Sequence, residues 1–101
     1  MADNRLAITG TLIELKSLRY TPAGVPVAEL RIEHESKQAE AGGERDVKCE
    51  LKAVVLGDLA KLVQGAKLGD RLKAGGFLAN RGKSARQLVL HITDIEFLEG
   101  N

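Results

Sequence analysis

Three cations within six residues, Arg81, Lys83 and Arg86, are the side chains of this sequence best suited to binding a polyanion. They lie in a longer stretch, between Asp70 and Asp94, that contains five basic residues and no Asp or Glu. Strand-like apolar runs flank these cations, so they should sit on a loop that projects from a sheet. A basic loop that contains glycine favours contact with phosphates. A solvated hairpin tip, whose cations serve only solubility, is the alternative that the loop by itself leaves open.

The composition bounds the class of protein. The chain of 101 residues fits one domain, residues 1–101, and its net charge of +1 means that any nucleic-acid surface must be local. Apolar residues make up 44% and charged residues 29% of the chain, which indicates a globular fold rather than disorder. No apolar run approaches the roughly 20 residues of a membrane span. The N-terminus lacks the features of a signal peptide. We therefore expect a cytoplasmic protein that does not associate with membranes.

Alternation of apolar and polar residues with period two indicates five strands. They are expected at about residues 4–18, 27–35 and 45–56, then after Asp70, and finally at residues 87–98. The alternation slips after Ile13, which predicts a bulge in the first strand. The adjacent Gly75 and Gly76 should let the fourth strand coil tightly. A polar connection over residues 37–44, with a Gly-Gly pair at its tip, should join the second and third strands.

The spacing of apolar residues changes to that of a helix after the third strand. Asp58 is the expected N-cap of this short helix, and Gly65 is expected to end it. Three strands, a helix and two strands, with glycine-marked bends, predict an all-β OB-fold, a five-stranded Greek-key barrel with a short helix between strands 3 and 4. Phe97 should help to close its core. The ligand face of such a barrel is flanked by the first and fourth loops, which are residues 19–26 and 81–86 here.

Other side chains could extend a DNA-binding face beyond the cations of residues 81–86. Lys48 and Lys52 lie on the outward face of the third strand, and Arg19 begins the first loop. Each of these three is equally well explained as a solvated surface cation. Tyr20 could stack on a base or pack its ring on the barrel rim. Phe77 is out of phase with the inward residues of the fourth strand, so it should face the ligand or a partner chain.

No catalytic residues, metal site or cofactor are expected. His34, His91 and Cys49 are the softer metal ligands, and no two of them have a spacing typical of zinc sites. His34 and Cys49 fall on inward phases of their strands. The carboxylates alternate with apolar residues on outer faces, as solvated charges do, and no nucleophile motif or phosphate-binding loop is present.

Four stretches of the sequence resemble the primosomal replication protein N (PriB) family, which is related to the single-stranded DNA-binding proteins. They are NRLAITGTL, RYTPAGVPVAELRIEHES, LGDRLKAGGFLA and LVLHITDIEFLE, which begin at residues 4, 19, 68 and 88. The resemblance implies a homodimeric OB-fold without catalytic activity that binds single-stranded DNA. It also implies two protein partners, which are the primosomal helicase and the next primosome loading factor. A protein of this family would stabilise the primosomal helicase on DNA and help to reload the replicative helicase at stalled forks.

The chain departs from this family at two positions of the strand 2–3 connection and early third strand. Family members that bind DNA well have bulky aromatic residues there, whereas this chain has Gly43 and Lys48. Stacking of a base on an aromatic side chain contributes about 1–3 kcal/mol, so DNA binding should be weaker or almost wholly ionic. The missing aromatic residues leave open a protein-interaction module with little intrinsic DNA affinity. An RNA-binding OB domain is a second alternative, since ribosomal proteins of this size use such barrels.

Overall fold

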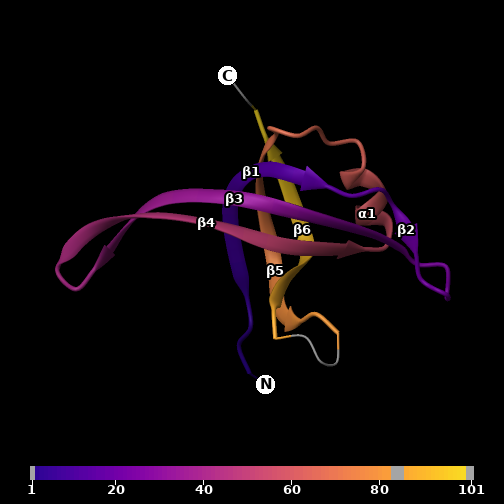
Figure 1. Ribbon diagram of the computed structural model, residues 1–101, viewed down its shortest axis with the longest axis horizontal. Helices are drawn as coiled ribbons and strands as arrows, with labels where there is room; N and C mark the ends of the chain where they lie inside the picture. Colours follow the sequence, from indigo (N-terminus) through magenta and orange to yellow (C-terminus); the bar gives the residue numbers. More distant parts are fainter. Residues whose placement is uncertain (1, 83–85, 100–101) are drawn as a thin grey trace.

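The computed structural model describes residues 2–82 and 86–99. Within them the chain forms six strands and one helix in the order β1 (Leu6–Leu15), β2 (Arg19–Tyr20), β3 (Pro26–Glu40), β4 (Gly43–Leu56), α1 (Asp58–Val63), β5 (Arg71–Asn80) and β6 (Leu88–Leu98). Apart from the two-residue β2, this is the expected succession of three strands, a helix and two strands (Figure 1). No helix among the described residues has the length and apolarity needed to cross a membrane.

The five long strands close into a ring because β1 pairs on both of its edges. One edge of β1 is antiparallel to β5 and the other is antiparallel to β3, while β3 continues to β4 and β5 to β6. A short parallel pairing of β4 with β6, at Ala53 and Val54, completes the circuit. β2 pairs with Pro26 and Val27 of β3, on the edge that β1 occupies further along the strand. This arrangement confirms the predicted OB-fold, with α1 between the third and fourth of its long strands.

The inward residues of every long strand of the ring contribute to one core. The largest fully buried side chains are Leu12, Ile32, Val55, Val63, Leu72 and Leu90. α1 adds Ala60 and Val63 to this core and leaves its other face in solvent. The period-two alternation of the sequence therefore has its expected cause, which is burial of one face of each strand.

The predicted bulge in the first strand is present, and a second irregularity lies at the Gly75-Gly76 pair. The register of β1 against β3 shifts between Leu12 and Glu14, and the register of β5 against β6 shifts between Gly75 and Gly76. At the second shift the backbones approach so closely that a Cβ on Gly76 would collide with the carbonyl oxygen of His91. Only glycine fits at this position without a backbone movement.

The polar connection predicted at residues 37–44 is wrong, because β3 and β4 continue as a long hairpin with pairing as far as Glu40 and Gly43. Only Ala41 and Gly42 form the turn, with positive φ values of 53° and 80°. The hairpin extends away from the ring, where both of its faces meet solvent (Figure 1). Polar residues are tolerated there on either face, so their presence did not indicate a loop.

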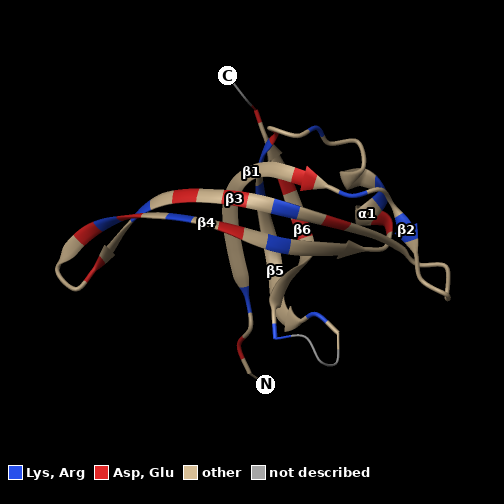
Figure 2. Cartoon of the chain, viewed as in Figure 1, with Lys and Arg blue, Asp and Glu red and all other residues tan. Residues whose placement is uncertain are grey.

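Opposite charges face each other across this hairpin arm, residues 35–48, and appear as alternating colours in Figure 2. Three ion pairs join its strands: Lys37–Asp46 at 3.2 Å, Arg45–Glu40 at 2.8 Å and Lys48–Glu35 at 3.7 Å. Each pair is exposed and contributes little by itself, but together they favour this register over others.

Three other details correct the sequence-based expectations. Cys49 is exposed rather than inward, because β1 supports β3 only as far as Glu33 and Cys49 lies opposite His34, beyond that point. Asp58 is the first residue of α1 and not its cap, since Gly57 occupies the cap position. Phe97 is 38% exposed instead of closing the core.

Candidate nucleic-acid interface

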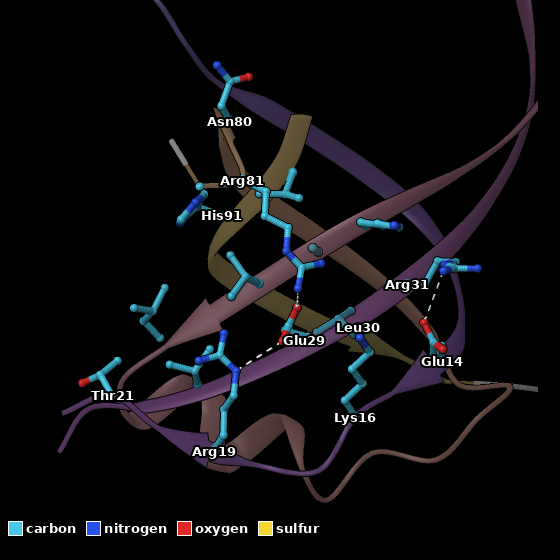
Figure 3. Close-up of a pocket in the computed structure, with 17 residues that line it drawn as sticks. Glu14, Lys16, Arg19, Thr21, Glu29, Leu30, Arg31, Asn80, Arg81 and His91 are labelled. Atoms are coloured by element: carbon cyan, nitrogen blue, oxygen red, sulfur yellow. Dashed lines mark hydrogen bonds and ion pairs between the residues drawn. The ribbon is translucent and has the colours of Figure 1, made fainter. Parts of the chain in front are cut away.

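A pocket of about 340 Å³ lies on the outer surface of the ring, between the segment that links β1 to β3 and the end of β5. Among the described residues it is lined by two carboxylates, Glu14 and Glu29, and by five cations, which are Lys16, Arg19, Arg31, Lys52 and Arg81 (Figure 3). Three of the seven predicted DNA-binding residues are among these cations: Arg19, Lys52 and Arg81. The fold thus gathers cations from both predicted loops and from the third long strand in one concave, electropositive site.

Glu29 joins the two predicted loops. Its Oε1 forms an ion pair with Nη2 of Arg81 at 2.9 Å. Its Oε2 accepts a hydrogen bond from Nε of Arg19 at 3.2 Å. Figure 3 shows the two guanidinium groups reaching the carboxylate from different sides. Arg19 pairs with Val27, which lies two residues before Glu29 on β3. The period of the strand therefore brings Arg19 within diagonal reach of Glu29.

Arg31 and Lys52, two other cations of the pocket, have longer contacts than the two arginines on Glu29. Nη2 of Arg31 lies 3.5 Å from Oε1 of Glu14, and its Nη1 lies 3.4 Å from Oε1 of Glu50. Two carboxylates therefore share the charge of Arg31. Lys52 donates a hydrogen bond of 3.4 Å to the side-chain oxygen of Gln87, which is neutral. The positive charge of Lys52 is therefore available to an anion in the pocket.

The comparisons with known proteins agree with this geometry. The model of a family described as another single-strand binding protein family matches residues 4–94. The replication restart protein PriB of Bordetella pertussis is 38% identical over 97% of this chain and 92% of its own length. That of Nitrosomonas europaea is 36% identical over 94% of this chain and 88% of its own length. This chain belongs to the PriB family. The resemblance read from the sequence is thereby confirmed.

A solved structure of the PriB family supports the same assignment. The protein PriB from Ralstonia solanacearum is similar to this chain with a TM-score of 0.88 and 34% identity, and the match covers 97% of this chain and 100% of that one. The expectation of a binding protein rather than an enzyme agrees with the single-strand binding family that the chain matches.

Among the other predicted site residues of this PriB-family chain, Tyr20, Lys48 and Arg86 lie outside the pocket. Tyr20 is 58% exposed on β2, so its ring is open to solvent and not packed under the barrel rim. Lys48 is on the hairpin arm, where it pairs with Glu35. Arg86 is exposed at the start of the segment that leads into β6. Lys83 lies outside the described residues.

An aromatic platform lies next to the cationic pocket. The rings of Phe77 and His91 are stacked with their centroids 5.0 Å apart and an angle of 8° between their planes. Phe77 pairs in register with His91, His91 with Val54, and Val54 with Glu29, so one row crosses β5, β6, β4 and β3. His91 lines the pocket, and Phe77 is 40% exposed. The platform and the cations therefore share one face of the ring.

The sequence indicated only part of this platform. The phase of Phe77 indicates that it faces outward, but the sequence identifies His91 only as a potential metal ligand. Their contact depends on the register of β5 against β6 after the bulge at Gly76, which no local pattern specifies. In the described part of the chain, no group of three or more potential metal ligands comes together.

Proposed function

We propose that this chain binds single-stranded DNA as a component of replication restart, with the strand lying along the face that carries the pocket and the Phe77–His91 platform. The single observation that carries the proposal is the meeting of five cations with an aromatic pair on one face of a PriB-family ring. Cations neutralise the phosphate backbone and release its counterions, while an aromatic ring accepts any base because every base has a π face.

Each group has a defined part in this proposal. Arg81 and Lys52 contact phosphates from two sides of the pocket, and Arg19 extends the track towards β2. Lys83 and Arg86 continue it along the β5–β6 segment, and Lys48 continues it along the hairpin arm. Phe77 stacks on a base, and the exposed Tyr20 offers a second ring where the strand leaves the pocket. These roles need no catalytic group, metal or cofactor.

The proposal includes the assembly that the family implies. A homodimer in the cytoplasm would hold unwound DNA beside the primosomal helicase and stabilise that helicase at a stalled fork. It would then pass the complex to the next loading factor, so that the replicative helicase is reloaded. The relatives named replication restart protein support this assignment.

Titration of a fluorescein-labelled oligo(dT) with the full chain, followed by anisotropy at several salt concentrations, tests the proposal. We expect binding at low salt that weakens linearly on a log–log plot of affinity against salt. Light scattering of the same samples gives the mass of the protein and of its complex. Competition with an RNA of equal length separates a DNA-binding from an RNA-binding domain. Absence of binding at low salt, or preference for RNA, would contradict the proposal.

The exposed ring of Phe77 gives the first specific prediction. F77A should weaken binding of oligo(dT) by about 5- to 150-fold, which corresponds to the roughly 1–3 kcal/mol that stacking of one base contributes. The salt dependence should stay as in the wild type, because no charge is lost. F97A is the matched control, since Phe97 is exposed to a similar extent at the far end of β6 and does not line the pocket. Equal affinities of F77A and F97A would exclude a stacking role for Phe77.

A protein-interaction module with little DNA affinity is the second candidate, and two observations favour it. Gly43 and Lys48 replace aromatic residues expected on the hairpin, and Glu29 already occupies two of the pocket arginines. Under this alternative the chain would bind the primosomal helicase in the absence of DNA and would not bind oligo(dT) even at low salt.

A further inference from the structure

Glu29 is the carboxylate most closely engaged with the cations proposed to bind DNA. Its side chain is 18% exposed, while those of Arg19 and Arg81 are 56% and 47% exposed. The carboxylate is thus held inside the pocket, and the two guanidinium groups keep part of their surface in solvent. Because each carboxylate oxygen engages one arginine, the three groups together carry one positive charge instead of two.

We propose that Glu29 is a built-in competitor of the DNA phosphates, which holds the affinity of this face for single-stranded DNA below the value that its arginines alone would give. The inference rests on the proposed function and names a residue that regulates the same site. Carboxylate and phosphate oxygens accept hydrogen bonds from the same guanidinium N–H groups. A phosphate that enters the pocket must therefore displace Glu29 or share the arginines with it.

Competition outweighs any positioning role of Glu29. Ion pairs whose cations are about half exposed contribute little to fixing a side chain, because solvent screens them and the long side chain loses entropy. A negative charge held in the pocket, by contrast, repels every bound phosphate close to it. Loss of the Glu29 charge should therefore leave the positions of Arg19 and Arg81 almost unchanged. It should also make one further positive charge available to DNA.

The E29Q variant tests this inference in the same oligo(dT) titration. Removing the charge lets the pocket neutralise one more phosphate, so the log–log salt slope should steepen by about 0.7. Extrapolated from 1 M to about 50 mM salt, that slope corresponds to a gain in affinity of up to about eightfold. The E29D variant keeps the carboxylate, so it should bind with the wild-type slope.

E33Q is the matched control. Glu33 lies four residues further along β3, and its substitution changes the net charge equally, but it does not line the pocket. E33Q should gain less than about threefold, through long-range attraction alone. Circular dichroism melts of all variants verify that they are folded.

The outcomes separate the inference from the proposed function. A gain in E29Q that exceeds the gain in E33Q, with E29D like the wild type, supports competition by Glu29. Equal effects of E29Q and E33Q would overturn it, and so would weaker binding by E29Q, because Glu29 would then position the arginines. If the wild type fails to bind oligo(dT) at low salt, the proposed function itself fails, and the inference with it.

Discussion

Replacement of Arg81, Lys83 and Arg86 by alanine should lower the affinity for oligo(dT) by about 500-fold at about 50 mM salt. Each phosphate contact on a single strand contributes about 0.7 to the log–log salt slope, so loss of three contacts should reduce the slope by about 2 per chain. Ionic contacts are largely screened at about 1 M salt, so the two proteins should bind about equally there. The change in slope, extended from about 1 M down to about 50 mM, gives the expected loss. Anisotropy titrations at four or more salt concentrations measure both quantities.

A second triple variant, K61A/K67A/R71A, controls for the loss of charge. These exposed residues lie on α1, on the segment after it and at the start of β5, so Arg71 is at the opposite end of that strand from Arg81. None of the three lines the pocket. The control should retain the wild-type slope to within about 0.7, the value of one contact. If the variant of residues 81, 83 and 86 also retained it, this segment would not be the phosphate-binding site.

The succession of elements could be predicted because burial leaves a direct trace in the sequence. Leu12 and Ile32 face one core, and the slip in alternation after Ile13 became the bulge in β1. The hairpin arm could not be predicted in this way. From Lys37 to Asp46 both of its faces meet solvent, so alternation there carries no information about burial. The sequence therefore predicts a polar connection where the structure has paired strands.

The candidate site was predictable residue by residue but not as an arrangement. The types and flanking residues of Arg19 and Arg81 indicated phosphate contacts, yet nothing local to either showed that they share a carboxylate. Glu29 is 10 residues from Arg19 and 52 from Arg81 in the sequence. Its position on an outward strand face predicts only a solvated charge. The β2–β3 pairing brings Arg19 to Glu29, and the pairing of β5, β6, β4 and β3 brings Arg81 there. Such long-range pairing decides whether a cation in the sequence is available to a ligand.

The close approach of β5 and β6 at Gly76 makes this glycine the most sensitive backbone position of the site. A Cβ placed there would collide with the carbonyl oxygen of His91 and would lie 2.9 Å from its carbonyl carbon. Both neighbours are backbone atoms, which cannot rotate away as a flexible side chain can. The next residue is Phe77, and His91 carries the ring stacked on it. Any backbone shift that accommodates a methyl group therefore disturbs the aromatic platform as well.

The G76A variant should consequently lose about 3 kcal/mol in free energy of unfolding, as overpacked sites do when backbone must move. Urea denaturation followed by far-UV circular dichroism measures this loss. G43A is the matched control, because the atom nearest to a Cβ on Gly43 is the carbonyl oxygen of Glu40, at 4.0 Å. It should change the stability by less than about 0.5 kcal/mol. Equal stabilities of G76A and G43A would mean that the two strands can separate at the bulge without cost. In that case their register would not be what holds Phe77 against His91.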